Sequence, residues 1–157
     1  MGSVRVGVVA AALAVVALGG CASTPGARDS AGQVTAPTTT DTYSVRVGDC
    51  LAKLPTESTD ALNLLPCGEA HYWEAFASVT LTGDAYPGDS VVRTEAEKAC
   101  DAAFTGFVGV TAAKSKLDLT MLTPTKETWT QASDREVVCL VGSAAGGVTG
   151  TLKDSAR

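Results

Sequence analysis

The hydrophobic and polar residues of segment 73–81 alternate, which is the period of a β-strand with one buried face. The positions expected to face the core are Trp73, Ala75, Ala77, Val79 and Leu81. Similar but shorter patterns predict further strands at 43–47, 62–65, 117–121, 136–141 and 148–152. Because Gly- and Pro-containing turns separate these segments, we expect a small antiparallel sheet.

The period changes after the turn Gly83–Gly88. From Asp89 or Ser90, either of which is a suitable N-cap, apolar residues recur at three- and four-residue steps as far as Phe107. The stripe consists of Val92, Ala96, Ala99, Cys100, Ala103, Phe104 and Phe107. One amphipathic helix is therefore expected. The predicted fold class is α+β, with a small antiparallel sheet packed against one main helix.

The N-terminal region has the pattern of a secretory signal. Residues 1–5 carry one positive charge, residues 6–18 are uninterrupted apolar residues, and a signal peptide over 1–20 is predicted. The following Leu18-Gly19-Gly20-Cys21 is typical of a lipobox, in which the Cys21 thiol receives a diacylglyceryl group. We expect a chain anchored by lipid at the extracytoplasmic face of the plasma membrane. An uncleaved anchor stays open, although a spanning helix needs about 20 apolar residues.

Residues 21–42 are rich in Thr, Pro and Ala and contain almost nothing large to bury. This composition predicts a flexible linker. The remaining residues, 43–157, contain enough Val, Leu, Phe and Trp for one modest core, so they are expected to form a single domain.

The charge balance argues against nucleic acid as a partner. The formal net charge is −5, all 17 acidic residues follow the predicted signal peptide, and Arg5 is lost with that peptide. No cluster of Lys and Arg is evident in the sequence, whereas binding to phosphate backbones requires one.

Four cysteines remain when Cys21 is reserved for lipid: Cys50, Cys67, Cys100 and Cys139. An even set in an oxidising compartment predicts two disulfides, for which three pairings are possible. We favour Cys50–Cys67, which joins neighbouring strand ends, and Cys100–Cys139, which joins two core-facing positions. The alternative is a metal site that combines Cys67 with His71. Because the chain has no Cys-x-x-Cys and one histidine, we expect neither a metal nor another cofactor.

Catalytic motifs are scarce. A hydrolase triad would have to centre on His71, the sole histidine, and neither a Gly-x-Ser-x-Gly elbow nor a phosphate-binding loop occurs. We assign no catalytic residue. His71, with Glu69 and Glu74 nearby, is a candidate partner contact sensitive to pH; more commonly such a histidine is structural and bonds a loop carbonyl.

Two further pairs of residues have alternative interpretations. Trp73 and Trp129 are either sugar-stacking rings or, more commonly in so small a domain, core residues. Asp134 and Arg135 are expected to form a turn with a local ion pair rather than a catalytic dyad.

Several short motifs together resemble the septum-formation domain of actinobacterial envelope proteins, over about residues 45–157. These motifs are Val47-Gly48-Asp49-Cys50-Leu51, Cys67-Gly68-Glu69-Ala70-His71 with Glu74 and Phe76, Tyr86-Pro87-Gly88, Cys100 with Phe104 and Val108-Gly109, Leu122-Thr123-Pro124-Thr125 with Trp129, 134–140, and 150–153. Ala70 departs from the family, whose members commonly have Pro before the histidine.

The resemblance implies an envelope protein associated with cell division, and it supplies no catalytic residue. The function we expect is a lipoprotein that acts as a non-enzymatic binding or scaffold module, with an envelope protein or a wall polymer as its partner. The alternative is a small cell-wall-modifying hydrolase.

Overall fold

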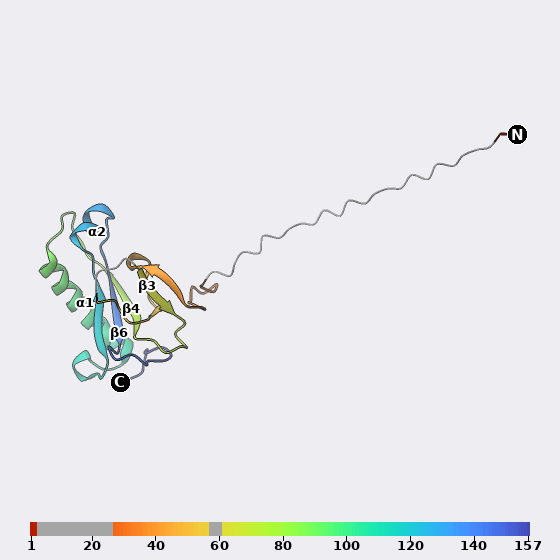
Figure 1. Ribbon diagram of the computed structural model, residues 1–157. Coiled ribbons are helices and arrows are strands. Elements are labelled where there is room, and N and C mark those ends of the chain that lie inside the picture. The colour runs from red at the N-terminus through yellow and green to blue at the C-terminus, as the bar shows by residue number, and fades with distance from the viewer. Residues whose placement is uncertain (3–26, 57–60) are drawn as a thin grey trace.

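A computed structural model describes residues 1–2, 27–56 and 61–157 (Figure 1). The predicted signal peptide and Cys21 fall almost wholly outside these residues, so the lipobox stays a prediction. The strands are β1 (Thr38–Asp41), β2 (Cys50–Leu51), β3 (Ala61–Leu65), β4 (Trp73–Thr80), β5 (Asp118–Leu122) and β6 (Glu136–Gly142). The helices are α1 (Asp89–Val108) and α2 (Lys126–Gln131), with 3-10 turns η1 (Thr42–Ser44) and η2 (Ala112–Lys114).

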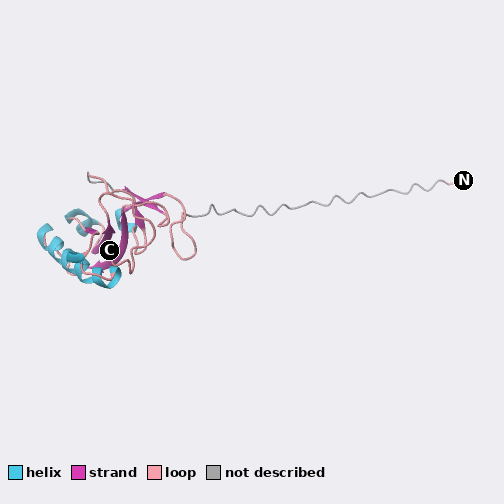
Figure 2. Cartoon of the chain, turned by 90° about the horizontal axis from the view of Figure 1, so that it is seen from below, coloured by secondary structure: helices cyan, strands magenta, loops and turns pink. Residues whose placement is uncertain are grey.

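The six strands form one antiparallel sheet in the order β1-β3-β2-β4-β6-β5. Its longest pairing is β4 with β6, whose register runs from Trp73 opposite Gly142 to Thr80 opposite Glu136. Helix α1 packs on one side of β4, β5 and β6, as the two perpendicular views show (Figures 1 and 2). The predicted α+β class is confirmed.

The first core lies between α1 and the sheet. Along α1, the buried residues are Val92, Ala96, Cys100, Phe104 and Val108. They meet Val137, Cys139 and Val141 from β6 and the ring of Phe76, which lies edge-on to Phe104 at a centroid distance of 6.0 Å. The predicted helical stripe is therefore confirmed as the face that packs on the sheet.

The predicted N-cap of this helix is wrong. Gly88 occupies the cap with φ of 101°, a conformation that glycine adopts without strain, and no side chain caps the helix. Its carbonyl accepts the N–H groups of Val91 and Val92, both at 3.1 Å. Asp89 instead lies in the first turn, where the helix dipole favours its negative charge.

A second core lies on the other side of the sheet. It is formed by Val34, Val45, Leu51, Leu62, Leu64, Trp73, Ala75, Val138 and Leu140. Strand β6 is consequently buried on both faces. The prediction that 73–81 buries one face is wrong for the first half of β4, where Glu74 and Phe76 are buried as well. The register shifts between Ala75 and Ala77, and such an irregularity redirects the side chains that follow.

The predicted flexible linker is wrong over residues 27–41, which we name the strap. Strand β1 pairs with β3, and Arg28 forms an isolated bridge with Val34, whose side chain enters the second core. The Arg28 guanidinium donates to both carboxylate oxygens of the buried Asp49, at 2.5 and 2.8 Å. This hydrogen bond, with the charge of Asp49, raises the pKa of Arg28 against the effect of burial. Main-chain pairing and one ion pair thus fasten a polar segment to the domain.

Two expected strands are absent from the described residues. Segment 43–47 begins in η1 and continues into a turn in which the Asp49 N–H donates to the Arg46 carbonyl at 3.0 Å. In segment 148–152, Val148 alone forms a bridge, opposite His71, and Gly150 then takes a positive φ of 72°. The first segment therefore contributes Val45 to the second core, and the second contributes Val148 and Leu152 to the first core, without forming a strand.

Candidate functional site

The expected partner contact around His71 is wrong, because two of its three residues are buried. His71 is 1% exposed, its Nδ1 donates to the Glu69 carbonyl at 2.9 Å, and its backbone pairs with Val148. Glu74 is 3% exposed and accepts from Thr151 Oγ1 at 2.7 Å and from the Leu152 N–H at 2.6 Å. The interpretation of His71 as a structural residue is confirmed. Together these contacts hold the C-terminal segment against β4.

The favoured cysteine pairing is confirmed. Cys50 is bonded to Cys67 and Cys100 to Cys139, with Cα–Cα distances of 5.2 and 5.4 Å. Because the Cys67 sulfur is in a disulfide, the alternative metal site with His71 is wrong. Within 27–56 and 61–157, no group of three potential ligands gathers for a metal ion.

The remaining sequence candidates are structural. Trp73 and Trp129 are buried, and the Trp129 Nε1 donates to the Asp84 carbonyl at 3.1 Å. The Arg135 guanidinium lies 3.8 Å from the centroid of the Trp129 ring and donates to the carbonyls of residues 83, 84, 129 and 134. The expected ion pair between Asp134 and Arg135 is therefore replaced by hydrogen bonds to the backbone.

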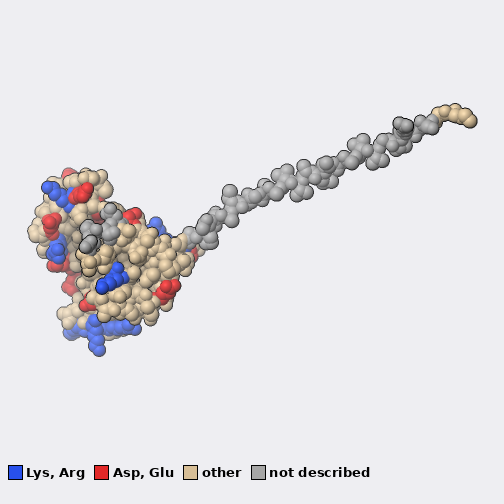
Figure 3. All heavy atoms as spheres, viewed as in Figure 1, with Lys and Arg blue, Asp and Glu red and all other residues tan. Residues whose placement is uncertain are grey.

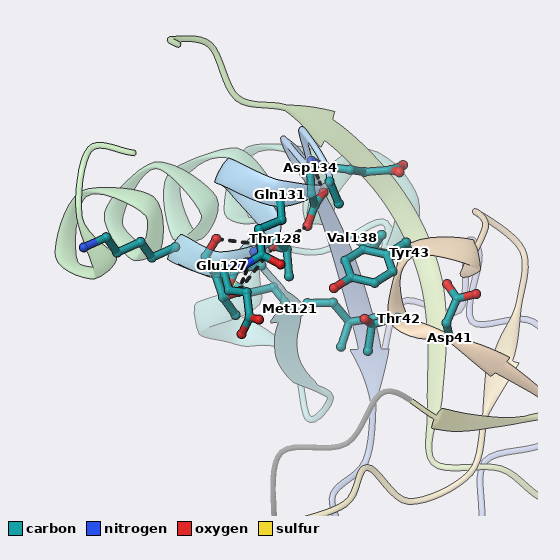
Figure 4. A pocket seen from close by; sticks show the side chains of 15 residues that line it. Asp41, Thr42, Tyr43, Met121, Glu127, Thr128, Gln131, Asp134 and Val138 are labelled. Carbon is teal, nitrogen blue, oxygen red and sulfur yellow. Dashed lines mark hydrogen bonds between the residues drawn. The ribbon is translucent and has the colours of Figure 1, made fainter. Parts of the chain in front are cut away.

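A groove of about 870 Å³ lies where five elements meet (Figure 4). The end of β1 with η1 forms one wall, α2 forms the opposite wall, and the end of β5 and the start of β6 lie between them. Its lining residues are Asp41, Thr42, Tyr43, Met121, Leu122, Thr123, Thr125, Lys126, Glu127, Thr128, Gln131, Ala132, Asp134, Glu136 and Val138. Hydroxyl, amide and carboxylate groups thus surround a small apolar patch.

Tyr43 is the exposed aromatic ring of this groove. Its side chain is 47% exposed, and its ring lies beside Val138 and Thr42 with the hydroxyl directed toward the α2 side (Figure 4). Met121 and Leu122, both partly buried, supply the apolar patch together with Val138. The Tyr43 ring therefore lies next to this apolar patch, and polar side chains surround both.

Helix α2 is held firmly as a wall. The Thr125 hydroxyl accepts from the Thr128 N–H at 3.2 Å, and the Thr128 hydroxyl accepts from the Thr125 N–H at 3.0 Å, which is a capping box. Asp134 accepts from the Thr128 hydroxyl and from the Glu136 N–H, both at 3.0 Å. These bonds connect the start of α2 to the start of β6.

A second hollow of about 650 Å³ adjoins the groove. Four residues line both spaces: Tyr43, Ala132, Asp134 and Glu136. Thr80, Ser133 and Arg135 complete its lining. We name the groove and this hollow together the cleft. Sequence reasoning missed it because its walls come from segments that are far apart in the chain and, taken singly, have the composition of ordinary loops.

The fold also gathers positive charge that the sequence does not show. The Ser115 hydroxyl donates to the Arg157 carbonyl at 2.6 Å, so Arg157 lies next to a segment that carries Lys114 and Lys116. Blue atoms accordingly gather at the end of the molecule where the C-terminus lies (Figures 1 and 3). The expectation that the chain forms no Lys/Arg cluster is therefore too broad.

The sequence matches the septum formation family over residues 47–156. The chain belongs to this family. The match includes β5, α2 and β6, whereas the strap, η1 and Tyr43 precede the septum formation match. No curated protein and no solved structure matches the chain. In the part of the chain that is described, no helix has both the length and the apolar character needed to cross a bilayer.

Proposed function

We propose that this septum formation protein is a non-enzymatic binding module of the cell envelope, held at the extracytoplasmic face of the plasma membrane by a lipid on Cys21. Family membership supports a role in septum formation. The lipobox supports the anchor, and two disulfides support an oxidising location. The partner is an envelope protein or a wall polymer that occupies the cleft.

The observation that carries the binding role is the cleft itself. It combines fixed walls, an exposed aromatic ring and a polar rim, which are the features of a recognition site. The carboxylate of Asp134 is occupied by two internal hydrogen bonds, and that of Asp41 accepts from the Ser44 hydroxyl at 3.0 Å. Both carboxylates serve to shape the cleft.

The position of His71 argues against the hydrolase alternative. His71 precedes β4, whereas Thr80 at the end of β4 lines the cleft. Nine residues of extended chain at about 3.3 Å each place them roughly 30 Å apart. A triad centred on His71 therefore has no access to the cleft.

The anchor is tested with Cys21→Ser in cells fed a labelled fatty acid. We expect the variant to lose the label and to leave the membrane fraction, while the wild-type chain retains both. A variant that partitions with membranes as fully as the wild type would show that the apolar segment is a retained anchor.

The binding role is tested by complementation of cells depleted of the protein. We expect Tyr43→Ala to fail to restore normally spaced septa, whereas Val91→Ala, an equally exposed position on α1 away from the cleft, restores them. Septa are counted with a membrane dye in cells that contain equal amounts of each chain. Equal rescue by both variants would remove the cleft from the function.

A further inference from the structure

The polar groups that remain available in the cleft are mostly neutral. Six polar residues that line the groove form no side-chain hydrogen bond or ion pair within the described chain: Thr42, Tyr43, Thr123, Lys126, Glu127 and Gln131. Three of these carry a hydroxyl group and one carries an amide, and both kinds of group donate and accept hydrogen bonds. A ligand that both donates and accepts at many positions would match them.

The charges of the cleft select against anionic ligands. Four carboxylates line it, those of Asp41, Glu127, Asp134 and Glu136, against two cationic side chains, Lys126 and Arg135. Three of the carboxylates accept hydrogen bonds: Asp41 from Ser44, Asp134 from Thr128 and the Glu136 N–H, and Glu136 from Ser78. This excess of carboxylates over cationic groups repels a phosphate-bearing polymer. Because three of the four carboxylates already accept hydrogen bonds, Glu127 is the one carboxylate among the described lining residues that is fully open to a basic peptide.

Tyr43 lies at the junction of the two hollows and lines both of them. An aromatic face packs well against the apolar face of another ring, while the phenol hydroxyl still forms hydrogen bonds. Each hollow falls within the roughly 300–1,000 Å³ of ordinary small-molecule sites. The arrangement suits a linear chain of polar rings that crosses Tyr43 and continues on both sides.

We propose that the cleft binds a neutral carbohydrate chain, with one sugar ring stacked on Tyr43 and its neighbours bonded by the free hydroxyl and amide groups of the cleft. A sugar ring has one face of C–H groups and a rim of hydroxyls, which is the combination that the ring and the rim of the cleft match. This inference rests on the proposed binding function and narrows its partner to one chemical class.

The test uses the full chain, purified from membranes in detergent, and isothermal titration with three neutral hexasaccharides. The probes are hexamers of N-acetylglucosamine, of galactose and of arabinose, with a phosphate-bearing glycan and a lysine-rich decapeptide as comparisons. We expect at least one neutral hexamer to bind, and the phosphate-bearing glycan to bind at least tenfold more weakly.

The variants locate the site. Tyr43→Ala should weaken binding by about tenfold or more, as loss of a central aromatic contact does. Tyr43→Phe keeps the stacking face and should retain most of the affinity. Val91→Ala, which lies outside the cleft, should bind as the wild type does.

Three outcomes would overturn the proposal. They are no binding of any neutral hexamer at concentrations up to 10 mM, tenfold above a Kd of 1 mM; hexamer binding that Tyr43→Ala leaves unchanged; and tighter binding of the decapeptide than of every neutral hexamer. The last result would assign the cleft to a basic peptide segment. None of them affects the lipid-labelling or septum-counting results, so failure of the carbohydrate proposal is distinguishable from failure of the binding role.

Discussion

The two cores of the protein are built differently, although they share strands β4 and β6. The α1 side is assembled from one long helix that lays a regular stripe on the sheet, with the Cys100–Cys139 disulfide in its middle. The strap side is assembled from short strands, and its outer layer is held by main-chain pairing and by the contact between Arg28 and Asp49.

The difference shows that burial of apolar surface stabilises one side of this small domain, whereas specific polar contacts stabilise the outer layer of the other. The α1 side contains large aromatic groups, so its stability comes mainly from removal of apolar surface from water. On the strap side, Val34 is the one apolar residue of the strap in the core, so the strap depends on hydrogen bonds and charge. The cleft lies where the two sides meet.

The largest expected effect is on the α1 side. Cys100→Ala should lower the free energy of unfolding by about 4 kcal/mol, and Cys50→Ala by about 3 kcal/mol, because the first disulfide closes the longer loop, with a separation of 39 residues against 17. Urea unfolding of each full chain gives the comparison. The control is the Cys100→Ala/Cys139→Ala double variant, which leaves no free thiol. A larger loss of unfolding free energy for Cys50→Ala than for Cys100→Ala would contradict this prediction.

The strap is the next target. Arg28→Ala leaves the Asp49 carboxylate buried with the Arg46 N–H as its remaining donor. We expect a loss of about 2 kcal/mol, less than for a fully buried pair because Arg28 is 22% exposed. Arg46→Ala is the matched control, since its backbone rather than its side chain contacts Asp49.

The strap variant has a second readout. Arg28→Ala should speed protease cleavage within 27–41 while cleavage elsewhere changes little, because local release of the strap exposes its backbone. Cleavage that accelerates equally over the whole chain would mean that the strap and the α1 side unfold as one unit.

A smaller effect is expected at α2, the wall that closes the cleft. Thr125→Ala removes the hydroxyl that caps the helix and should cost about 1 kcal/mol. Thr130→Ala is the control, because its exposed hydroxyl donates to the carbonyls of Lys126 and Glu127 in the first turn and does not cap the helix. Amide hydrogen exchange of 126–131 provides the measurement. Unchanged protection in Thr125→Ala would show that the bonds to Asp134 suffice.

The smallest expected effect is a difference in pH dependence between the Tyr86–Asp89 contact on the α1 side and the Arg28–Asp49 contact on the strap side. The hydrogen bond to Asp89 raises the pKa of Tyr86 above its ordinary value, and the bond to Asp49 raises the pKa of Arg28 above its ordinary value. The stability that each contact gives is complete below the unfolded pKa and is lost as pH rises through the folded value. Above pH 10, the Tyr86 contact should therefore weaken while the strap holds. Ultraviolet titration of the tyrosine phenolates in the wild type and in Asp89→Asn measures this change. Identical titration curves for the two chains would show that Asp89 does not raise the pKa of Tyr86.

The α1 side was predictable from the sequence because its signals are local. A stripe such as Val92, Ala96 and Cys100 repeats with the helical period, and β6 is a short continuous apolar run, so each can be placed from its own segment of sequence. The disulfide pairing followed from that placement. The cap at Gly88 was missed because Asp89 and Ser90 have better capping side chains, and side-chain type says nothing about where the backbone turns.

The strap and the cleft were not predictable in the same way. Residues 27–41 have the composition of a linker, and what orders them is pairing with β3 and the contact with Asp49, partners that follow later in the chain. Tyr43 was assigned to a strand because it begins an alternating segment, yet it lies in η1 at the rim of the cleft. Long-range pairing carries no periodic signal in either segment.

If Cys21 carries the proposed lipid, the docked strap also limits how far the domain can move from the membrane. With lipid on Cys21, a flexible segment reaching residue 43 would allow a radius of roughly 75 Å, from about 3.4 Å per residue of extended chain. Because Arg28 is fixed to Asp49, seven residues remain and the radius falls to about 25 Å. A chain with lipid on Cys21 would therefore stay within a thin layer next to the bilayer, and its binding partner would have to reach that layer.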